Sequence, residues 1–341
     1  MTSIPTILSH NASLRERIAP GFVAVFAGAT SGIGLATLKV LTASLVAPRF
    51  YVIGHSKAKF TLQHLPDLTS SNAQVEIIFL EAEVSLLKDV DRVCNHILTE
   101  ESHLDLLFMS PESVSLGEPQ YTAENIDIII ALSYLSRMRL TANLLPLLNH
   151  DESPRVISIL AGGHEKPLFI PHDQDVLLRN KENYTTTRAV NQAITLNSLA
   201  FSHLASLNPR VSFMHVYPGW VATDFLNKFL SNGGMAGKIA SWMAWPVTKF
   251  AAMSPEECGQ RQAFLATSDR YPSREQILSG QVEDGGAESH GGGGSGFYRV
   301  LEDGRTVGKT FLLGRIEEEE WSEKVWSLAE RVFREVLAGM N

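Results

Sequence analysis

The chain has 341 residues, of which 44% are hydrophobic and 19% are charged, so it can supply a large buried core. Its formal net charge of −8 at pH 7 argues against nucleic acid as the main partner. The two cysteines, Cys94 and Cys258, are far apart and have no Cys or His neighbours at metal-ligand spacing, which predicts no metal site and a reducing compartment. Because no apolar segment of signal-peptide or membrane-spanning length is present, we expect a cytoplasmic protein without a transmembrane segment.

After a short N-terminal lead-in, a strand, a glycine-rich turn and a helix follow one another directly. Residues 1–20 form a polar lead-in with one short helix expected to start at Asn11 or Ser13. Residues 23–26 are an apolar run of strand length, and 35–41 have apolar residues at helical spacing. The glycines between them are Gly28, Gly32 and Gly34. This order lets the backbone approach a ligand closely and offers helix N–H groups to a pyrophosphate; the alternative is a tight turn without a ligand.

Apolar runs and helical periodicity then alternate along the chain. The expected strands are 50–53, 75–80, 104–109, 156–160, 211–216 and, at the sheet edge, 297–300. Helical periodicity fills 126–148 and 186–207, and a terminal helix begins near Trp321 behind an acidic run. Strands that are almost continuously apolar and alternate with helices predict an α/β fold. We expect a Rossmann-type, doubly wound parallel sheet of about seven strands with helices on both faces.

We expect one domain over residues 1–341. Segment 226–252 is rich in large apolar residues but is interrupted by glycine and proline, which suits a mobile lid. The alternatives are a helix pair packed on the core and a membrane-surface helix over 236–252. A glycine-rich loop over 283–296 is expected to be flexible. The parts are the lead-in 1–20, the dinucleotide-binding core 21–226, the lid 227–255 and the C-terminal extension 256–341.

Ordered motifs over residues 20–226 resemble the short-chain dehydrogenase/reductase family. The glycine spacing of the first turn is similar to that of the family, and Glu83-Val84 stands where the family has an Asp that contacts the adenine ring. The stretch 217–223 is similar to the Pro-Gly loop that lines the nicotinamide. Tyr184 lies 23 residues after Ala161, a spacing that resembles the retinol-dehydrogenase-like branch, whose substrates are bulky and apolar. A further resemblance is to fungal members of secondary-metabolite pathways.

The end of the second strand bears on the choice of cofactor. It reads Gly54-His55-Ser56-Lys57 and contains no carboxylate for a ribose 2′-hydroxyl, so we expect NADP(H); the alternative is a solvated loop whose Lys57 points away. The cofactor contacts implied by the residues and the resemblance are Gly28, Thr30, Ser31, Gly32, Ile33, Gly34, His55, Ser56, Lys57, Glu83, Val84, Tyr184, Arg188, Pro218, Gly219, Val221 and Thr223.

The catalytic residues that the resemblance implies are altered in this chain. Tyr184 and Arg188 match the family's Tyr-x-x-x-Lys with Arg in place of Lys, and four-residue spacing predicts that Arg188 lowers the pKa of Tyr184. Ser133 stands where the family has an Asn that holds a relay water. Ala161 stands at the position of the carbonyl-binding Ser, and His164 can reach the same site from the loop, although a lone loop histidine is more often solvated.

The residues leave three functions open. The first is an NADP(H)-dependent oxidoreductase that acts on the carbonyl or alcohol of a bulky apolar small molecule, with Tyr184 transferring the proton. The second is a redox-neutral isomerase or cyclase that keeps the cofactor pocket, which the altered Ser and Lys positions favour. The third is a non-catalytic dinucleotide-binding protein. The oligomeric state and the direction of reaction stay undetermined.

Overall fold

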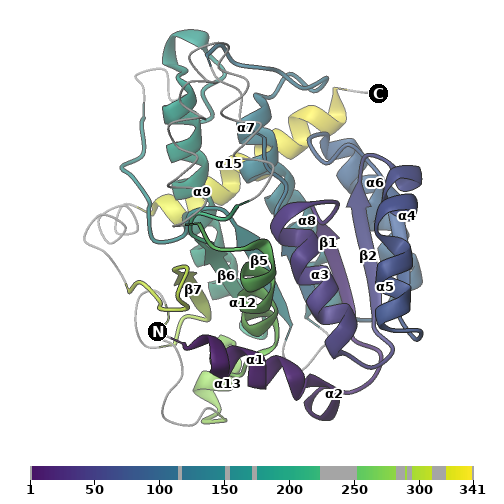
Figure 1. Ribbon diagram of the computed structural model, residues 1–341. Helices are drawn as coiled ribbons and strands as arrows, with labels where there is room; N and C mark the ends of the chain where they lie inside the picture. The colour runs from purple at the N-terminus through teal and green to yellow at the C-terminus, as the bar shows by residue number, and fades with distance from the viewer. Residues whose placement is uncertain are drawn as a thin grey trace.

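A parallel sheet of seven strands lies at the centre of the molecule, in the order β3-β2-β1-β4-β5-β6-β7 (Figure 1). The computed structural model describes residues 2–113, 117–149, 154–170, 175–222, 252–281, 289, 294–308 and 320–339. The strands are β1 Val23–Ala27, β2 Arg49–Gly54, β3 Glu76–Glu81, β4 Leu106–Met109, β5 Arg155–Ile159, β6 Ser212–Val216 and β7 Phe297–Val300. The predicted fold class and all seven predicted strands are confirmed, with ends shifted by one or two residues.

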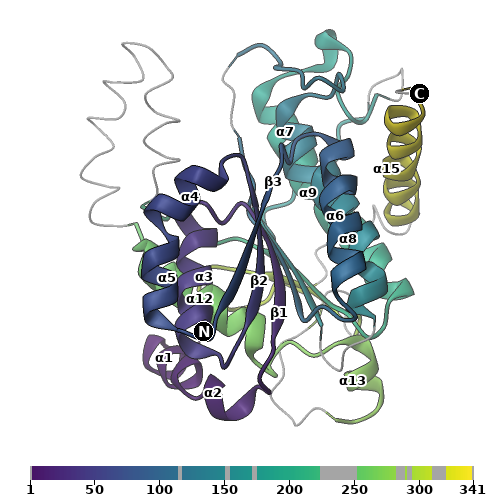
Figure 2. The same ribbon diagram turned by 90° about the vertical axis from the view of Figure 1, so that its right-hand side faces the viewer.

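Helices cover both faces of this sheet (Figure 2). One face carries α3 Gly32–Ser44, α4 Lys57–Gln63, α5 Leu65–Ser71 and α12 Pro255–Thr267. The other carries α6 Leu87–Glu100, α7 Ile128–Ile130, the π-helical turn η1 Ala131–Leu135, α8 Ser136–Leu148, α9 Thr186–Leu207 and α15 Trp321–Ala338. Because neighbouring strand residues point to opposite faces, Val25 joins the core on the α6 side and Phe26 the core on the α3 side. A short α13, Arg274–Leu278, precedes β7, and the turn η2, Lys181–Asn183, precedes α9.

The N-terminal lead-in differs from the prediction of one short helix. Helix α2, Leu14–Arg17, begins directly after Ser13 as expected, but a longer helix α1, Ile4–Ala12, precedes it. Ser3 caps α1 by accepting a hydrogen bond from the backbone N–H of Thr6, and a proline occupies its first turn. Asn11 is therefore no helix start; its side chain donates to Gln260 of α12 and holds the lead-in on the core.

The strand order fixes where a ligand can bind. From β1 the chain builds outward to β2 and β3, and then returns to place β4 on the other side of β1. At such a reversal the loops after the two central strands separate, which opens a crevice at the carboxyl edge of the sheet. The glycine turn follows β1 and therefore lies at this crevice.

Several predictions concern residues outside the described part of the chain. These are Thr223, the lid and membrane-surface alternatives over 227–251, and most of the glycine-rich loop 283–296. Among the described helices, the stretch 128–148 is long and apolar enough to span a bilayer by composition, but 72% of its most apolar window is buried inside the protein. This stretch is the core helix expected over 126–148.

Candidate active site

The turn between β1 and α3 leaves no room for side chains. Gly28 has a φ of +88°, and a Cβ there would lie 2.6 Å from the backbone nitrogen of Pro111. A Cβ on Gly34 would lie 2.6 Å from the carbonyl oxygen of Gly28 and 2.7 Å from Oγ of Ser110. The Ser110 hydroxyl donates a hydrogen bond to that same carbonyl. The loop after β4 is thus packed directly on the glycine turn.

The first turn of α3 is open toward a ligand. Its N-cap residue, Ser31, is exposed and extended, and its side chain makes no capping hydrogen bond. Gly32 follows with a φ of +59°, and the first turn contains no acidic residue. Free N–H groups and the positive end of a helix dipole suit an anion, so this turn fits the pyrophosphate of a dinucleotide. Thr30 lies against the end of β2, 2.6 Å from the position of a Cβ on Gly54.

The residues predicted to bind a 2′-phosphate lie at the end of β2. His55, Ser56 and Lys57 are exposed, and the Ser56 hydroxyl caps α4 by accepting from the backbone N–H of Lys59. His55 Nδ1 lies 3.2 Å from a carboxylate oxygen of Glu83, the residue predicted to contact the adenine ring. The structure therefore places His55 and Glu83, both predicted to contact the cofactor, next to each other.

Sequence reasoning missed His64 at the same edge. Burial, followed by the charge of Lys39, lowers the pKa of its imidazole, and the backbone of Thr30 acts in the opposite direction. On the neighbouring strand end, Glu83 accepts hydrogen bonds from the N–H and hydroxyl of Ser85, and Val84 is buried. No periodicity or motif indicates His64, because its place depends on how α4 packs beside the turn.

The Pro-Gly loop after β6 is tied to two later segments. Gly219 has a φ of +77°, and a Cβ there would lie 2.9 Å from the side chain of Glu302. Val221 is buried and forms a parallel bridge with Met253, just before α12. Pro218 precedes Gly219 at the carboxyl edge of the sheet.

Tyr184 is buried in a small apolar cluster with Ile129, Leu178 and Ala189. Among the described residues, neither the Tyr184 hydroxyl nor Oδ2 of Asp127 has a hydrogen bond of normal geometry. Each of the two groups nevertheless contributes to the pKa of the other. Burial, followed by the charge of Asp127, raises the pKa of Tyr184 to about 12. The phenol therefore stays protonated at neutral pH.

The prediction that Arg188 lowers the pKa of Tyr184 is wrong. The Arg188 guanidinium lies 3.8 Å from the ring centre of Phe169 and donates to the carbonyl of Asn183. The physical reason is that Tyr184 precedes α9 in extended conformation, so the rule that places residues i and i+4 on one helical face does not apply.

Ser133, the predicted holder of a relay water, is buried. It belongs to the π-helical turn η1, where its carbonyl accepts a hydrogen bond from the Asn197 side chain of α9. Ile129, four residues before Ser133, packs with Tyr184, so a joint role of Tyr184 and Ser133 stays a prediction. Arg188 lies on Phe169 and does not join them as predicted.

A buried polar layer lies beneath the carboxyl edge instead. Arg137 of α8 is fully buried and donates to the Ser158 hydroxyl and to the carbonyls of Ile159 and Pro111. Ser158 in turn donates to Asn197. These residues hold the loops after β4 and β5 in place, and only their positions in three dimensions identify them.

Comparison with known proteins agrees with this geometry. Residues 22–232 match the short chain dehydrogenase family. The chain is 36% identical over 338 residues to Oxidoreductase AN1596 of Emericella nidulans, covering 97% of each, and 34% identical to Oxidoreductase lepF of Aspergillus flavus, covering 99% of this chain and 98% of that one. It is 23% identical to human retinol dehydrogenase 11, covering 76% of each.

Among solved structures, L-sorbose reductase from Gluconobacter frateurii, in complex with NADPH and L-sorbose, is similar with a TM-score of 0.55 at 17% identity. The likeness covers 73% of this chain and 90% of that one. The glycine turn, the strand order and the family match together show that this chain is an oxidoreductase of the short-chain dehydrogenase/reductase family.

Proposed function

We propose that the protein is an NADP(H)-dependent oxidoreductase acting on the carbonyl or alcohol of a bulky apolar small molecule, in a fungal secondary-metabolite pathway. The observation that carries this proposal is the first turn of α3 beside the glycine turn, where an uncapped helix start meets the sheet crevice with no room for side chains at Gly28 and Gly34. The fungal relatives support the biological setting. Both cysteines are buried and free, which supports a cytoplasmic location.

The residues at the end of β2 support NADP(H) over NAD(H). His55 and Lys57 are exposed cationic or protonatable groups beside the cap of α4, and no Asp or Glu stands in 54–57. The two glutamates nearby are engaged: Glu81 accepts the backbone N–H of Lys57, and Glu83 lies beside His55. A phosphate can therefore meet the side chain of Lys57, whereas a bare ribose has no carboxylate in 54–57 to bind its 2′-hydroxyl.

Tyr184 supports catalysis in the direction of reduction. When bound, the cofactor supplies the hydride; the residues of this chain must then supply a proton to the developing alcohol. The phenol of Tyr184, whose pKa is raised to about 12, keeps its proton at neutral pH and can pass it only to a stronger base, such as the alkoxide that hydride transfer generates.

The test follows NADPH absorbance with a panel of hydrophobic ketones and aldehydes, alongside NADPH and NADH binding measured by fluorescence. We expect NADPH oxidation that Tyr184→Phe abolishes. The matched control is Tyr271→Phe, because Tyr271 is also a buried tyrosine but its hydroxyl bonds the carbonyl of Gly304, in the C-terminal extension. Tighter binding of NADH than of NADPH would refute the cofactor assignment.

One observation favours a second candidate function. The family's serine position is Ala161, and Arg188 is turned away from Tyr184, which suits a redox-neutral isomerase or cyclase that retains the cofactor pocket. In the same assay, product formation at constant NADPH supports this alternative. Tight NADPH binding without any product supports a non-catalytic dinucleotide-binding protein.

A further inference from the structure

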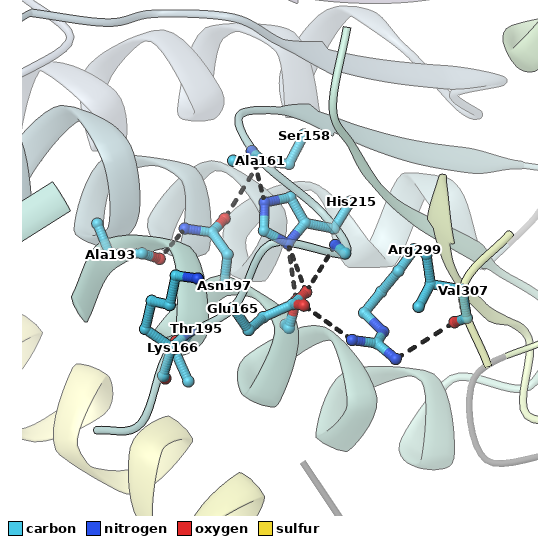
Figure 3. A network of polar contacts seen from close by, with 12 residues as sticks. Ser158, Ala161, Glu165, Lys166, Ala193, Thr195, Asn197, His215, Arg299 and Val307 are labelled. Carbon is cyan, nitrogen blue, oxygen red and sulfur yellow. Dashed lines mark hydrogen bonds and ion pairs between the residues drawn. The ribbon is translucent and has the colours of Figure 1, made fainter. Parts of the chain in front are cut away.

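The loop after β5 is held from below by a chain of buried hydrogen bonds (Figure 3). The backbone N–H of Ala161 donates to Nε2 of His215 at 3.3 Å, and His215 Nδ1 lies 2.7 Å from the Ser198 hydroxyl. Ser198 donates to Oε1 of Glu165 at 2.6 Å. Since Nε2 accepts, this pattern assigns the imidazole proton to Nδ1. Every bond of the chain then has one donor and one acceptor.

The chain continues into the C-terminal extension. Arg299 of β7 donates to the other carboxylate oxygen of Glu165 at 2.8 Å, and both side chains are almost fully buried. The second Nη group of Arg299 donates to the carbonyls of Val307 and Gly308. Glu165 also accepts the backbone N–H of Gly163 at 3.0 Å. One buried ion pair thus fixes the segment 161–165 to the last strand of the sheet.

This fixed loop presents His164 at the surface. The backbone N–H of His164 donates to the carbonyl of Ala161, which closes a tight turn through Gly163 at a φ of +90°. The imidazole is exposed and meets the ring of Tyr217 edge-on, with the ring centres 4.3 Å apart. Tyr217 is the first residue of the Pro-Gly loop. His164 therefore stands between the two loops that border the site at the ends of β5 and β6.

We propose that His164 donates the hydrogen bond to the substrate carbonyl that Ala161 cannot donate, and that Glu165, held by Arg299, is its positioning residue. The inference rests on the proposed reductase function. An imidazole N–H is a hydrogen-bond donor that can polarise a carbonyl. His164 lies three residues after Ala161, in the same tight turn. The ring of Tyr217 limits the directions that the imidazole can take.

The first experiment measures kcat/KM for carbonyl reduction in His164→Ala and in the double variant Ala161→Ser with His164→Ala. We expect His164→Ala to lose about 100-fold. The double variant regains about tenfold, because a hydroxyl at position 161 supplies a donor from the same loop. The control is His96→Ala, another exposed histidine that meets a tyrosine ring edge-on, on α6. Unchanged kcat/KM in His164→Ala overturns the proposal.

The second experiment tests the positioning role without using activity. Hydrogen–deuterium exchange is compared in Arg299→Met, Arg299→Lys and the uncharged double variant Glu165→Gln with Arg299→Met. We expect faster exchange in peptides over 160–166 in all three variants, with β1 and α3 unchanged and NADPH affinity retained. The control pair is Arg210→Met with Glu275→Gln, which removes an exposed ion pair.

The outcomes separate the two proposals. If wild-type protein binds NADPH but reduces no carbonyl, the proposed function is refuted and the role assigned to His164 with it, while the exchange data still decide whether Glu165 and Arg299 fix the loop. Exchange over 160–166 that matches wild type in a folded Arg299→Lys variant overturns the positioning role. Equal acceleration over the whole chain also overturns it, because it reports general destabilisation.

Discussion

The glycine turn makes a quantitative prediction for Gly34→Ala. In this structure the new methyl group would lie 2.6 Å from the Gly28 carbonyl oxygen, 2.7 Å from Oγ of Ser110 and 2.9 Å from Cα of Ala29. To lengthen these contacts to about 3.3 Å, the neighbouring atoms must move by about 0.6 Å. A binding site tolerates displacements of only ~0.5 Å. The group that must move is the backbone of the turn itself.

Two energies oppose each other in this variant. Overpacking costs about 1–3 kcal/mol, and replacing glycine by alanine inside a helix returns about 1 kcal/mol. We therefore expect the free energy of unfolding to fall by about 0–2 kcal/mol. NADPH affinity should fall at least tenfold, about 1.4 kcal/mol, because the displaced turn is the one that cradles the phosphates.

The matched control is Gly259→Ala. Gly259 lies in α12, and a methyl group there would lie 2.7 Å from the backbone of Ala36 in α3, so the steric conflict is similar but occurs where α3 packs against α12. Urea unfolding followed by circular dichroism gives the stability of both variants, and fluorescence titration gives the NADPH dissociation constant. The reasoning is refuted if both variants lose the same affinity, or if Gly34→Ala binds NADPH as wild type does.

Three further predictions test other parts of the site. Lys57→Glu should weaken NADPH binding about tenfold and leave NADH binding nearly unchanged, since the proposed partner of that side chain is the 2′-phosphate, which NADH lacks; equal losses for both cofactors in parallel titrations would contradict this. Ala161→Ser in the wild-type background should raise carbonyl reduction by restoring a hydroxyl donor, measured as kcat/KM with the ketone panel; no gain would place the family's serine elsewhere. Burial lowers the pKa of His215 from 6.5 in the unfolded chain to about 3, so the unfolded state binds the extra proton and stability falls as the pH drops below about 6.5. That loss approaches about 1.4 kcal/mol per pH unit, and urea unfolding of His215→Asn at pH 7 and pH 5 should show a pH slope smaller by about one proton; an unchanged slope would show that His215 is not the titrating group.

The sequence alone was sufficient for the sheet and its nucleotide-binding turn. The strands β1, β2 and β4 are built on runs of adjacent apolar residues, and such a run reports burial on both faces without reference to the rest of the chain. The segment 297–300 was predicted as a strand at the sheet edge, and β7 has these bounds. The glycine turn was equally local, because its strand, glycines and helix follow one another directly.

The candidate catalytic groups depended on contacts that sequence spacing does not encode. Asp127, which acts on the pKa of Tyr184, is 57 residues away, and Arg299 is 134 residues from Glu165. The prediction for Arg188 assumed that Tyr184 lies inside the helix, but α9 begins two residues later. Local patterning thus determined which elements form, whereas the charges that act on each buried side chain were decided by loop paths and helix starts, because electrostatic interactions depend on separation in space and on burial.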